Sequence, residues 1–109
     1  MSYHITATAK FRKELKKLSK KYHSLAIEYT NLIDNLEDNP NFGTALGNDC
    51  YKIRLSIASK NKGKSGGARV ITYVYVTDET VFLLSIYDKS KQASITKEEI
   101  MALIEDIGL

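Results

Sequence analysis

The chain has 109 residues, of which 43% are hydrophobic and 27% are charged. This is the composition of a globular protein, so we expect one domain over residues 1–109 with a single core. One cysteine, Cys50, excludes an intrachain disulfide and a cysteine-based zinc cluster. No apolar run approaches the ~20 residues of a membrane span, and the first residues lack a signal-peptide pattern. We therefore expect a cytoplasmic protein with no membrane partner.

The basic residues are concentrated in two blocks. The net charge is +3, from 16 basic and 13 acidic residues. Residues 10–21 hold seven basic side chains against one acid, Glu14, and residues 50–70 hold six with no acid. Residues 22–49 between them hold five acids and neither lysine nor arginine. Two basic blocks separated by an acidic one suit a polyanion such as nucleic acid, although a solvated lysine-rich face is the ordinary alternative for each block.

The N-terminal part of the chain predicts a short strand followed by two helices. Residues 3–8 carry β-favouring side chains in weak alternation, which favours a strand. Apolar residues recur at helical spacing over residues 9–21, with basic residues on the opposite face. The same spacing over residues 25–36 predicts a second helix that ends near Asn39 and Pro40. The short link makes the two helices an antiparallel hairpin.

The rest of the chain predicts three strands and a closing helix. The first strand begins at Cys50. Its apolar side chains recur at every second residue up to Ile57, and Lys52 and Arg54 between them face the other way. Residues 68–77 and 80–87 are rich in Val, Ile, Tyr and Phe and flank a turn, which predicts a β-hairpin. Residues 96–99 fit a capping box in front of an apolar stripe, which predicts the final helix.

This order of elements predicts an α+β fold. We expect an N-terminal short strand, a helical hairpin packed on one face of a three- to four-stranded antiparallel sheet, and a C-terminal helix. The other face of the sheet is then partly open, and it carries Lys52 and Arg54. A basic surface on a rigid sheet is suited to holding a phosphate backbone.

Further functional side chains are expected on that second face. A meander brings the end of its third strand beside the start of its second, so Tyr87 and Lys89 should lie near Arg69. If the turn places Ile71 opposite Tyr87, one face of the sheet carries Arg69, Tyr73, Tyr87 and Lys89. We expect this to be the face that carries Lys52 and Arg54. The valines at the alternate positions would then enter the core: Val70, Val74 and Val76.

Residues 59–67 predict a mobile cationic loop, in which Lys62 and Lys64 can close over a polyanion; a plain hairpin loop is the alternative. Gly63-Lys64-Ser65 matches the end of a nucleotide-binding P-loop. That motif, however, needs glycine where Ala58 stands, and a helix where a strand is expected here. Neither histidine has a second ligand at metal-binding spacing, and the cysteine has no histidine near it. We therefore expect no metal, no cofactor and no covalent catalysis.

Three segments of the predicted sheet resemble a known family. They are Cys50-Tyr51-Lys52-Ile53-Arg54-Leu55, Ala68-Arg69-Val70-Ile71-Thr72-Tyr73 and Leu83-Leu84-Ser85-Ile86-Tyr87-Asp88-Lys89-Ser90-Lys91. They look like the successive strands of RelE-like toxins, in the RelE/ParE superfamily of type II toxin-antitoxin systems. The resemblance implies a ribosome-dependent endoribonuclease, or mRNA interferase, that cuts mRNA in the ribosomal A site. It also implies three partners: a cognate antitoxin, the mRNA and the small-subunit rRNA of the ribosome.

The resemblance assigns catalytic roles by position. Lys52 and Arg54 match the paired basic residues that the family carries on the first strand of the meander. Arg69 matches the family's phosphate-binding arginine. Lys89 and Lys91 match the basic pair that follows the last strand.

The chain departs from the family at Arg54, where a family member has a lysine cast as the base, and near Ile95, where that member has a tyrosine. Metal-free RNA cleavage needs the 2′-hydroxyl to attack its own phosphate, with a base, an acid and positive charge at the site. A guanidinium keeps its proton in proteins, so Arg54 and Arg69 stabilise charge. Lys52 and Tyr87 are the candidates for the base, because neighbouring cations favour loss of a proton from each.

The candidate site residues fall into two groups. The catalytic candidates are Lys52, Arg54, Arg69, Tyr87 and Lys89. The candidates for RNA binding, which we expect to anchor the protein rather than take part in chemistry, are Lys16, Lys17, Lys20, Lys62, Lys64, Tyr73 and Lys91.

Two other functions stay open. One is that of the ParE branch of the superfamily, which binds and inhibits DNA gyrase and has no need of the basic cluster on the sheet. The other is that of a catalytically inactive RNA-binding relative, because the residues do not identify the base.

Overall fold

The computed structural model describes residues 2–60 and 67–109. Its helices and strands are β1 (His4–Ala7), α1 (Ala9–Lys21), α2 (Leu25–Asp38), β2 (Thr44–Gly47), β3 (Cys50–Leu55), β4 (Ala68–Tyr75), β5 (Thr80–Asp88) and α3 (Lys97–Ile107). The described strands form a five-stranded sheet in the order β1-β5-β4-β3-β2. The predicted α+β class is confirmed.

The sheet differs in two ways from the expected three to four antiparallel strands. β2 adds a fifth strand, which pairs with β3 at one edge. All four residues of β2 are exposed, so no alternation of apolar and polar side chains marks it in the sequence. β1 pairs with β5 in parallel, while the other neighbouring strands are antiparallel. Nothing local in the sequence predicts this pairing, because β1 and β5 lie far apart in the sequence.

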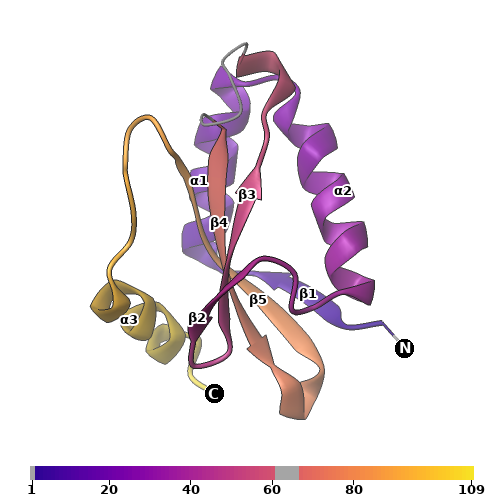
Figure 1. Ribbon diagram of the computed structural model, residues 1–109, viewed down its shortest axis with the longest axis vertical. Helices are drawn as coiled ribbons and strands as arrows, with labels where there is room; N and C mark the ends of the chain where they lie inside the picture. The colour runs from indigo at the N-terminus through magenta and orange to yellow at the C-terminus, as the bar shows by residue number, and fades with distance from the viewer. Residues whose placement is uncertain (1, 61–66) are drawn as a thin grey trace.

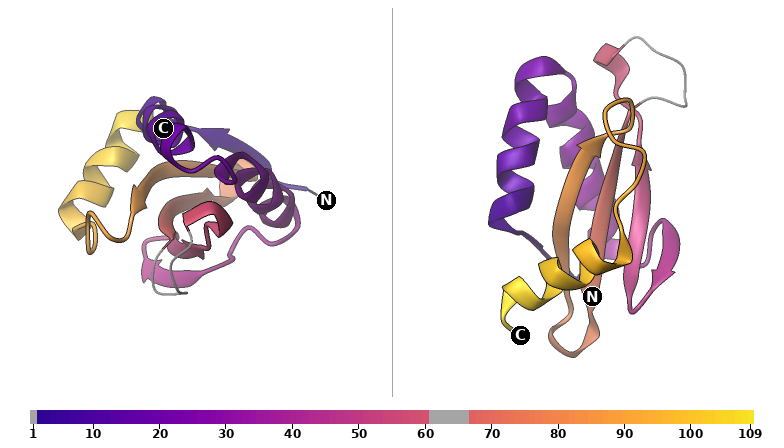
Figure 2. Two further views of the ribbon diagram at one scale, coloured as in Figure 1. Left: turned by 90° about the horizontal axis from the view of Figure 1, so that it is seen from above. Right: turned by 90° about the vertical axis from the view of Figure 1, so that its left-hand side faces the viewer.

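The helical hairpin covers one face of the sheet, here called the helix face (Figure 1). α1 and α2 lie side by side in one layer, as the view from above shows (Figure 2). Phe11, Leu25 and Leu36 of these helices are fully buried and pack in one core with Ile53 and Val70 of the sheet. The apolar residues at helical spacing thus form the main core of the protein.

The opposite face bears Arg54 and Arg69 and is here called the arginine face. α3 covers part of it: Ile100 packs with Ile71 and Leu84 in a second, smaller core. Adjacent residues of a strand point to opposite faces, so this core is separate from the one beneath the hairpin. The part of the arginine face beyond α3 carries the basic side chains.

The C-terminal helix begins as the sequence predicts. The Thr96 hydroxyl accepts a hydrogen bond from the Glu99 N–H, and the Glu99 carboxylate accepts one from the Thr96 N–H, both at 3.1 Å. These bonds form the expected capping box. No helix in the described part of the chain has both the length and the apolar character that a membrane crossing requires.

A β-bulge in β5 determines which face its later side chains take. Ile71 of β4 pairs with Ser85, and the next residue of β4 pairs with Leu83. Leu84 is therefore an extra residue in β5, and an extra residue shifts the alternation of faces by one position. Leu83 and Ile86 consequently both pack on the helix face, although they are an odd number of residues apart.

The observed register between β4 and β5 differs from the expected one. Tyr87 lies opposite Arg69 rather than opposite Ile71. The difference is an even number of residues, so Tyr87 still shares a face with Arg69. Val76 does not enter the core: it is 61% exposed, because it lies in the 3-10 turn (Val76–Asp78) that follows β4.

Candidate functional site

Three of the predicted site residues stand side by side across the sheet. Arg54 of β3 pairs with Arg69 of β4, and Arg69 pairs with Tyr87 of β5. Opposed residues in antiparallel strands have Cβ atoms about 5 Å apart, so the three side chains form one row, here called the site row. Lys52 lies one same-face position along β3, opposite Ile71. The structure therefore brings together four of the five catalytic candidates directly.

The centre of the site row is buried. Arg69 is 6% exposed, and its Nη1 donates a hydrogen bond of 3.1 Å to the carbonyl of Ala68. Tyr87 is 5% exposed, and its hydroxyl has no hydrogen-bond partner within residues 2–60 and 67–109. Arg54 is exposed and Lys52 is half-buried. A polyanion thus meets Arg54 and Lys52 before it meets the buried pair.

The protonation of Tyr87 follows from this burial. Desolvation raises the pKa of Tyr87 above its ordinary value of 10.0, and the nearby charge of Arg69, which lowers it, is the smaller effect. The phenol is therefore neutral at neutral pH. A neutral phenol donates a proton or a hydrogen bond, which favours the role of an acid over that of the base considered from the sequence.

Lys89 adjoins the end of the site row. Its backbone N–H donates to the Gly67 carbonyl at 3.0 Å, which ties the end of β5 to the start of β4. Its Nζ donates to the Ala93 carbonyl at 2.8 Å in the connection to α3. Lys91 is exposed in the same connection. The basic pair after the last strand therefore lies at the end of the sheet that carries Arg69.

Tyr73 shares the arginine face but not the site row. Its ring stacks on those of Tyr75 and Phe82, with the centroids 6.4 Å apart in each pair. Along β4 it lies ~13 Å from Arg69, at about 3.3 Å per residue. The structure places Tyr73 beside the apolar cluster under α3 and does not bring it together with the arginines.

The lysines of α1 form a separate exposed surface. Lys16, Lys17 and Lys20 are all exposed. The Tyr22 hydroxyl, just beyond α1, donates a hydrogen bond of 2.8 Å to the buried carboxylate of Asp88 at the end of β5. The last turn of α1 therefore lies at the same end of the molecule as the site row (Figure 1). The other two lysine candidates, Lys62 and Lys64, lie outside the described residues.

One contact behind the site row was not predicted from the sequence. The Glu14 Oε1 accepts hydrogen bonds from the Ser85 hydroxyl at 3.0 Å and from the Ile86 N–H at 3.2 Å. Both donors belong to the bulged part of β5. The sequence signal for this contact is that Glu14 is the lone acid of the first basic block.

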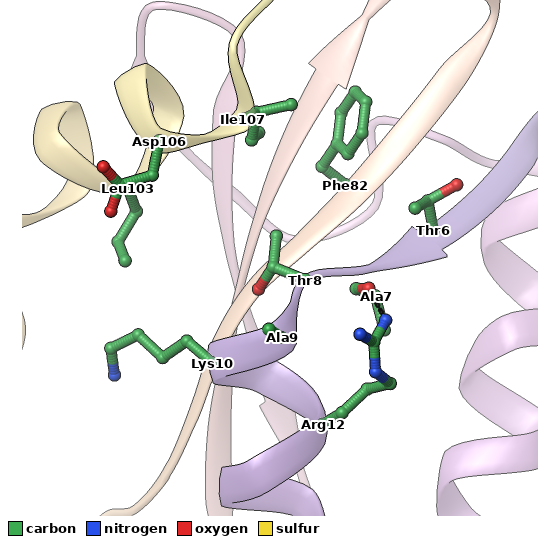
Figure 3. A pocket seen from close by; sticks show the side chains of 10 residues that line it. All are labelled: Thr6, Ala7, Thr8, Ala9, Lys10, Arg12, Phe82, Leu103, Asp106 and Ile107. Carbon is green, nitrogen blue, oxygen red and sulfur yellow. Dashed lines mark hydrogen bonds between the residues drawn. The ribbon is translucent and has the colours of Figure 1, made fainter.

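A cavity of about 410 Å³ lies beside α3 (Figure 3). Its walls include Thr8 and Arg12 at the start of α1, Phe82 of β5, and Leu103 and Ile107 of α3. The described residues that line it include no candidate site residue, so the site row is a separate surface. In the same described part of the chain, no group of three or more His, Cys, Asp or Glu side chains could hold a metal ion.

Comparisons with known proteins agree on one fold. A free-state variant of the E. coli toxin RelE, with two arginines replaced by alanine, has 20% sequence identity and a TM-score of 0.66, and the match covers 98% of this chain and 99% of that one. The isolated E. coli RelE toxin has 22% identity and a TM-score of 0.52, with 95% and 98% of the chains covered. The intact E. coli RelBE toxin-antitoxin complex has 24% identity and a TM-score of 0.50, with 78% and 94% covered.

A family model extends this likeness from fold to family. The model described as the RelE toxin of the RelE / RelB toxin-antitoxin system matches residues 8–106. The matched range contains both helices of the hairpin, the whole site row and all of α3 except its last residue. The chain therefore belongs to the RelE toxin family.

Proposed function

We propose that the protein is the toxin of a type II toxin-antitoxin module and acts as a ribosome-dependent, metal-independent endoribonuclease. It cleaves mRNA in the ribosomal A site and so stops translation in the cytoplasm, and a cognate antitoxin neutralises it. Membership of the RelE family supports the toxin assignment. The single observation that carries the nuclease assignment is the site row, in which Arg54 opposes Arg69 and Arg69 opposes Tyr87.

The opposed arginines favour a phosphate ligand. Like charges at directly opposed positions of an antiparallel sheet cost free energy. A phosphate between Arg54 and Arg69 offsets that cost, because guanidinium groups bind phosphate oxygens through paired, charge-assisted hydrogen bonds. The same two groups stabilise the extra negative charge of a phosphorane, so their effect is larger in the transition state than in the ground state.

The unpaired phenol supplies the acid. In RNA cleavage the 2′-hydroxyl attacks the adjacent phosphorus, a 2′,3′-cyclic phosphate forms, and the bond to the 5′-oxygen of the next nucleotide breaks. That 5′-oxygen leaves as a hydroxyl only if it gains a proton. Tyr87 is neutral, buried beside Arg69 and free of a hydrogen-bond partner among the described residues, so its proton is available for this step.

The base takes the proton of the attacking 2′-hydroxyl. Lys52 is the candidate, since it lies on the same face one position along from Arg54, whose guanidinium cannot accept a proton. Lys89 at the end of the row adds positive charge for the same phosphate. The ribosome holds the mRNA in place, and orientation of this kind contributes much of the rate enhancement of in-line attack.

The exposed lysines of α1 bind rRNA. Lys16, Lys17 and Lys20 are displayed on one helix at the end of the molecule that carries the site row. Such charges bind phosphates through counterion release and need no particular sequence. This surface therefore serves to dock the toxin on the ribosome with the site row towards the mRNA.

Brief induction of the gene in growing cells tests the proposal. We expect protein synthesis to stop within minutes while plasmid supercoiling stays unchanged, and we expect Arg69→Ala to leave both unchanged. Co-expression of the product of a small reading frame beside the gene should restore growth. Loss of negative supercoiling with continued protein synthesis would instead indicate a gyrase inhibitor, and the absence of any arrest would indicate an inactive relative.

A further inference from the structure

The face on which Tyr87 lies depends on the bulge in β5. Leu84 and Tyr87 both pack on the arginine face, although they are an odd number of residues apart. Without the extra residue, strict alternation would place Tyr87 on the helix face and Ile86 beside Arg69. Both side chains are bulky and largely apolar, so hydrophobic burial alone does not choose between the two arrangements. Some other contact must hold the bulge in place.

α1 and its N-cap residue, Thr8, make polar contacts on both sides of the extra residue. Before Leu84, the Thr8 N–H and the Thr8 hydroxyl both donate to the Leu83 carbonyl at 3.1 Å. After it, Glu14 Oε1 accepts from the Ser85 hydroxyl and from the Ile86 N–H, at 3.0 and 3.2 Å. The helix thus fixes the backbone immediately before and immediately after the bulge.

Glu14 is oriented for this contact. Its second oxygen, Oε2, pairs with Lys10 Nζ one turn earlier in α1, which leaves Oε1 directed at β5. Its side chain is 27% exposed, so the two bonds to β5 are partly shielded from water. The pairing of β1 with β5 ends at Leu83, and beyond that point the Ile86 N–H finds its acceptor in Glu14.

We propose that Glu14 is a positioning residue for Tyr87: by accepting from Ser85 and Ile86 it holds the bulge that keeps the phenol beside Arg69. This inference rests on the proposed function for its chemical consequence, but not for its structural one. This role also gives a reason for the one acidic residue of α1, the helix whose lysines are proposed to bind RNA. Tyr22, which donates to Asp88 just after Tyr87, holds the strand on the other side of the phenol.

Three variants separate positioning from charge and from general stability. Glu14→Ala removes both bonds to β5. Glu14→Gln keeps them, because a single oxygen accepts both and the glutamine carbonyl can replace it, while the negative charge is lost. Asp34→Ala removes a carboxylate from an exposed position of α2 and is the matched control for charge.

The first readout is independent of activity. Hydrogen exchange and tyrosine-ring chemical shifts are measured by NMR on the purified, full-length variants. We expect Glu14→Ala to speed exchange of the Ile86 amide about tenfold or more and to shift the Tyr87 ring signals, because the local bulge opens. Glu14→Gln and Asp34→Ala should match the wild type. Unchanged Ile86 exchange and unchanged Tyr87 signals in Glu14→Ala would overturn the inference.

The second readout is single-turnover cleavage of mRNA on saturating programmed ribosomes, in a double-mutant cycle with Tyr87→Phe. We expect Glu14→Ala, Tyr87→Phe and the double variant to be slowed by the same factor, on the order of 100-fold, with Glu14→Gln near wild type. Independent, additive losses would overturn the inference. Ser85→Ala, which removes one of the two donors, serves if Glu14→Ala does not fold, and we expect an intermediate loss. If wild type itself cleaves nothing, the proposed function fails, and the NMR result alone decides the role of Glu14.

Discussion

Arg69 lies directly opposite Tyr87 across β4 and β5, and the two side chains are 6% and 5% exposed. A permanent cation and a neutral phenol are thus held together away from water, where their interactions with an anion are stronger than in solution. The phenol has no hydrogen-bond partner among the described residues, which costs folding free energy. Under the proposed function, the phenol hydroxyl is kept for a ligand at this cost in stability.

Tyr87→Phe tests this trade between activity and stability. Removing a buried hydroxyl that has no partner should raise the free energy of unfolding by about 1 kcal/mol. Removing the acid should slow cleavage on the ribosome by ~100-fold. Urea unfolding and single-turnover cleavage measure the two effects. A variant that is less stable and cleaves normally would show that the hydroxyl serves the fold.

Thr72→Val is the matched control on the helix face. The Thr72 hydroxyl is also buried without a partner among the described residues, but its neighbours Val70 and Val74 on alternate positions belong to the main core. Valine has nearly the same shape, so we expect a similar gain of about 1 kcal/mol in unfolding free energy. Cleavage should stay at the wild-type rate. A large loss of cleavage would extend the site through the sheet.

The pH dependence of cleavage distinguishes the two roles of Tyr87. Burial raises the pKa of Tyr87 above 10.0, so an acid remains protonated from about pH 7 to about pH 9, and the rate should not fall in that range on its account. A Tyr87 base would have to be ionised, and the rate would rise about tenfold per pH unit over the same range. We expect no such rise from Tyr87. A cleavage rate that rises with pH in the wild type but not in Tyr87→Phe would contradict the acid role.

The two arginines should respond differently to substitution. Arg69→Ala should abolish growth arrest, because it removes the buried charge at the centre of the site row. Arg54 is exposed, and Arg54→Lys should retain part of the activity as a point charge without the guanidinium fork, or raise it by supplying a base. Growth arrest and single-turnover rates measure both, with circular dichroism to check the fold. Full toxicity of Arg69→Ala would remove the nuclease assignment from this face.

Replacing Lys16, Lys17 and Lys20 together by alanine should weaken ribosome binding without changing chemistry. Each lost phosphate contact lowers the dependence of log Kd on log salt by about one unit or less. The matched control replaces the same three lysines by arginine, which keeps the charge. Sedimentation with ribosomes at several salt concentrations measures binding. A slower single-turnover rate at saturating ribosome would place these lysines in the active site.

Patterns within single elements predicted most of the fold. Period-two alternation placed Lys52 and Arg54 on the face opposite the core, and helical spacing predicted the hairpin and α3. Even the wrong register between β4 and β5 kept Arg69 and Tyr87 on one face, because the error was an even number of residues. The family resemblance is confirmed as well.

Features that depend on contacts distant in sequence could not be predicted. The parallel pairing of β1 with β5 and the bulge at Leu84 involve residues that lie far apart in the sequence, so no local pattern records them. The burial of Tyr87 depends on residues packed around it on the arginine face, and this burial raises the pKa of the phenol; the sequence shows only the neighbouring cations, which made Tyr87 a candidate for the base beside Lys52. The site roles of the individual residues remain predictions.

Primer extension on a translated mRNA is the most direct test of the proposed nuclease function. Purified wild-type protein is mixed with naked mRNA or with the same mRNA on programmed ribosomes, beside Arg69→Ala as the matched control. We expect stops within the A-site codon on ribosomes for wild type, none for Arg69→Ala, and largely intact naked RNA. Rapid cleavage of naked RNA, or A-site stops of equal strength with Arg69→Ala, would contradict the proposed function.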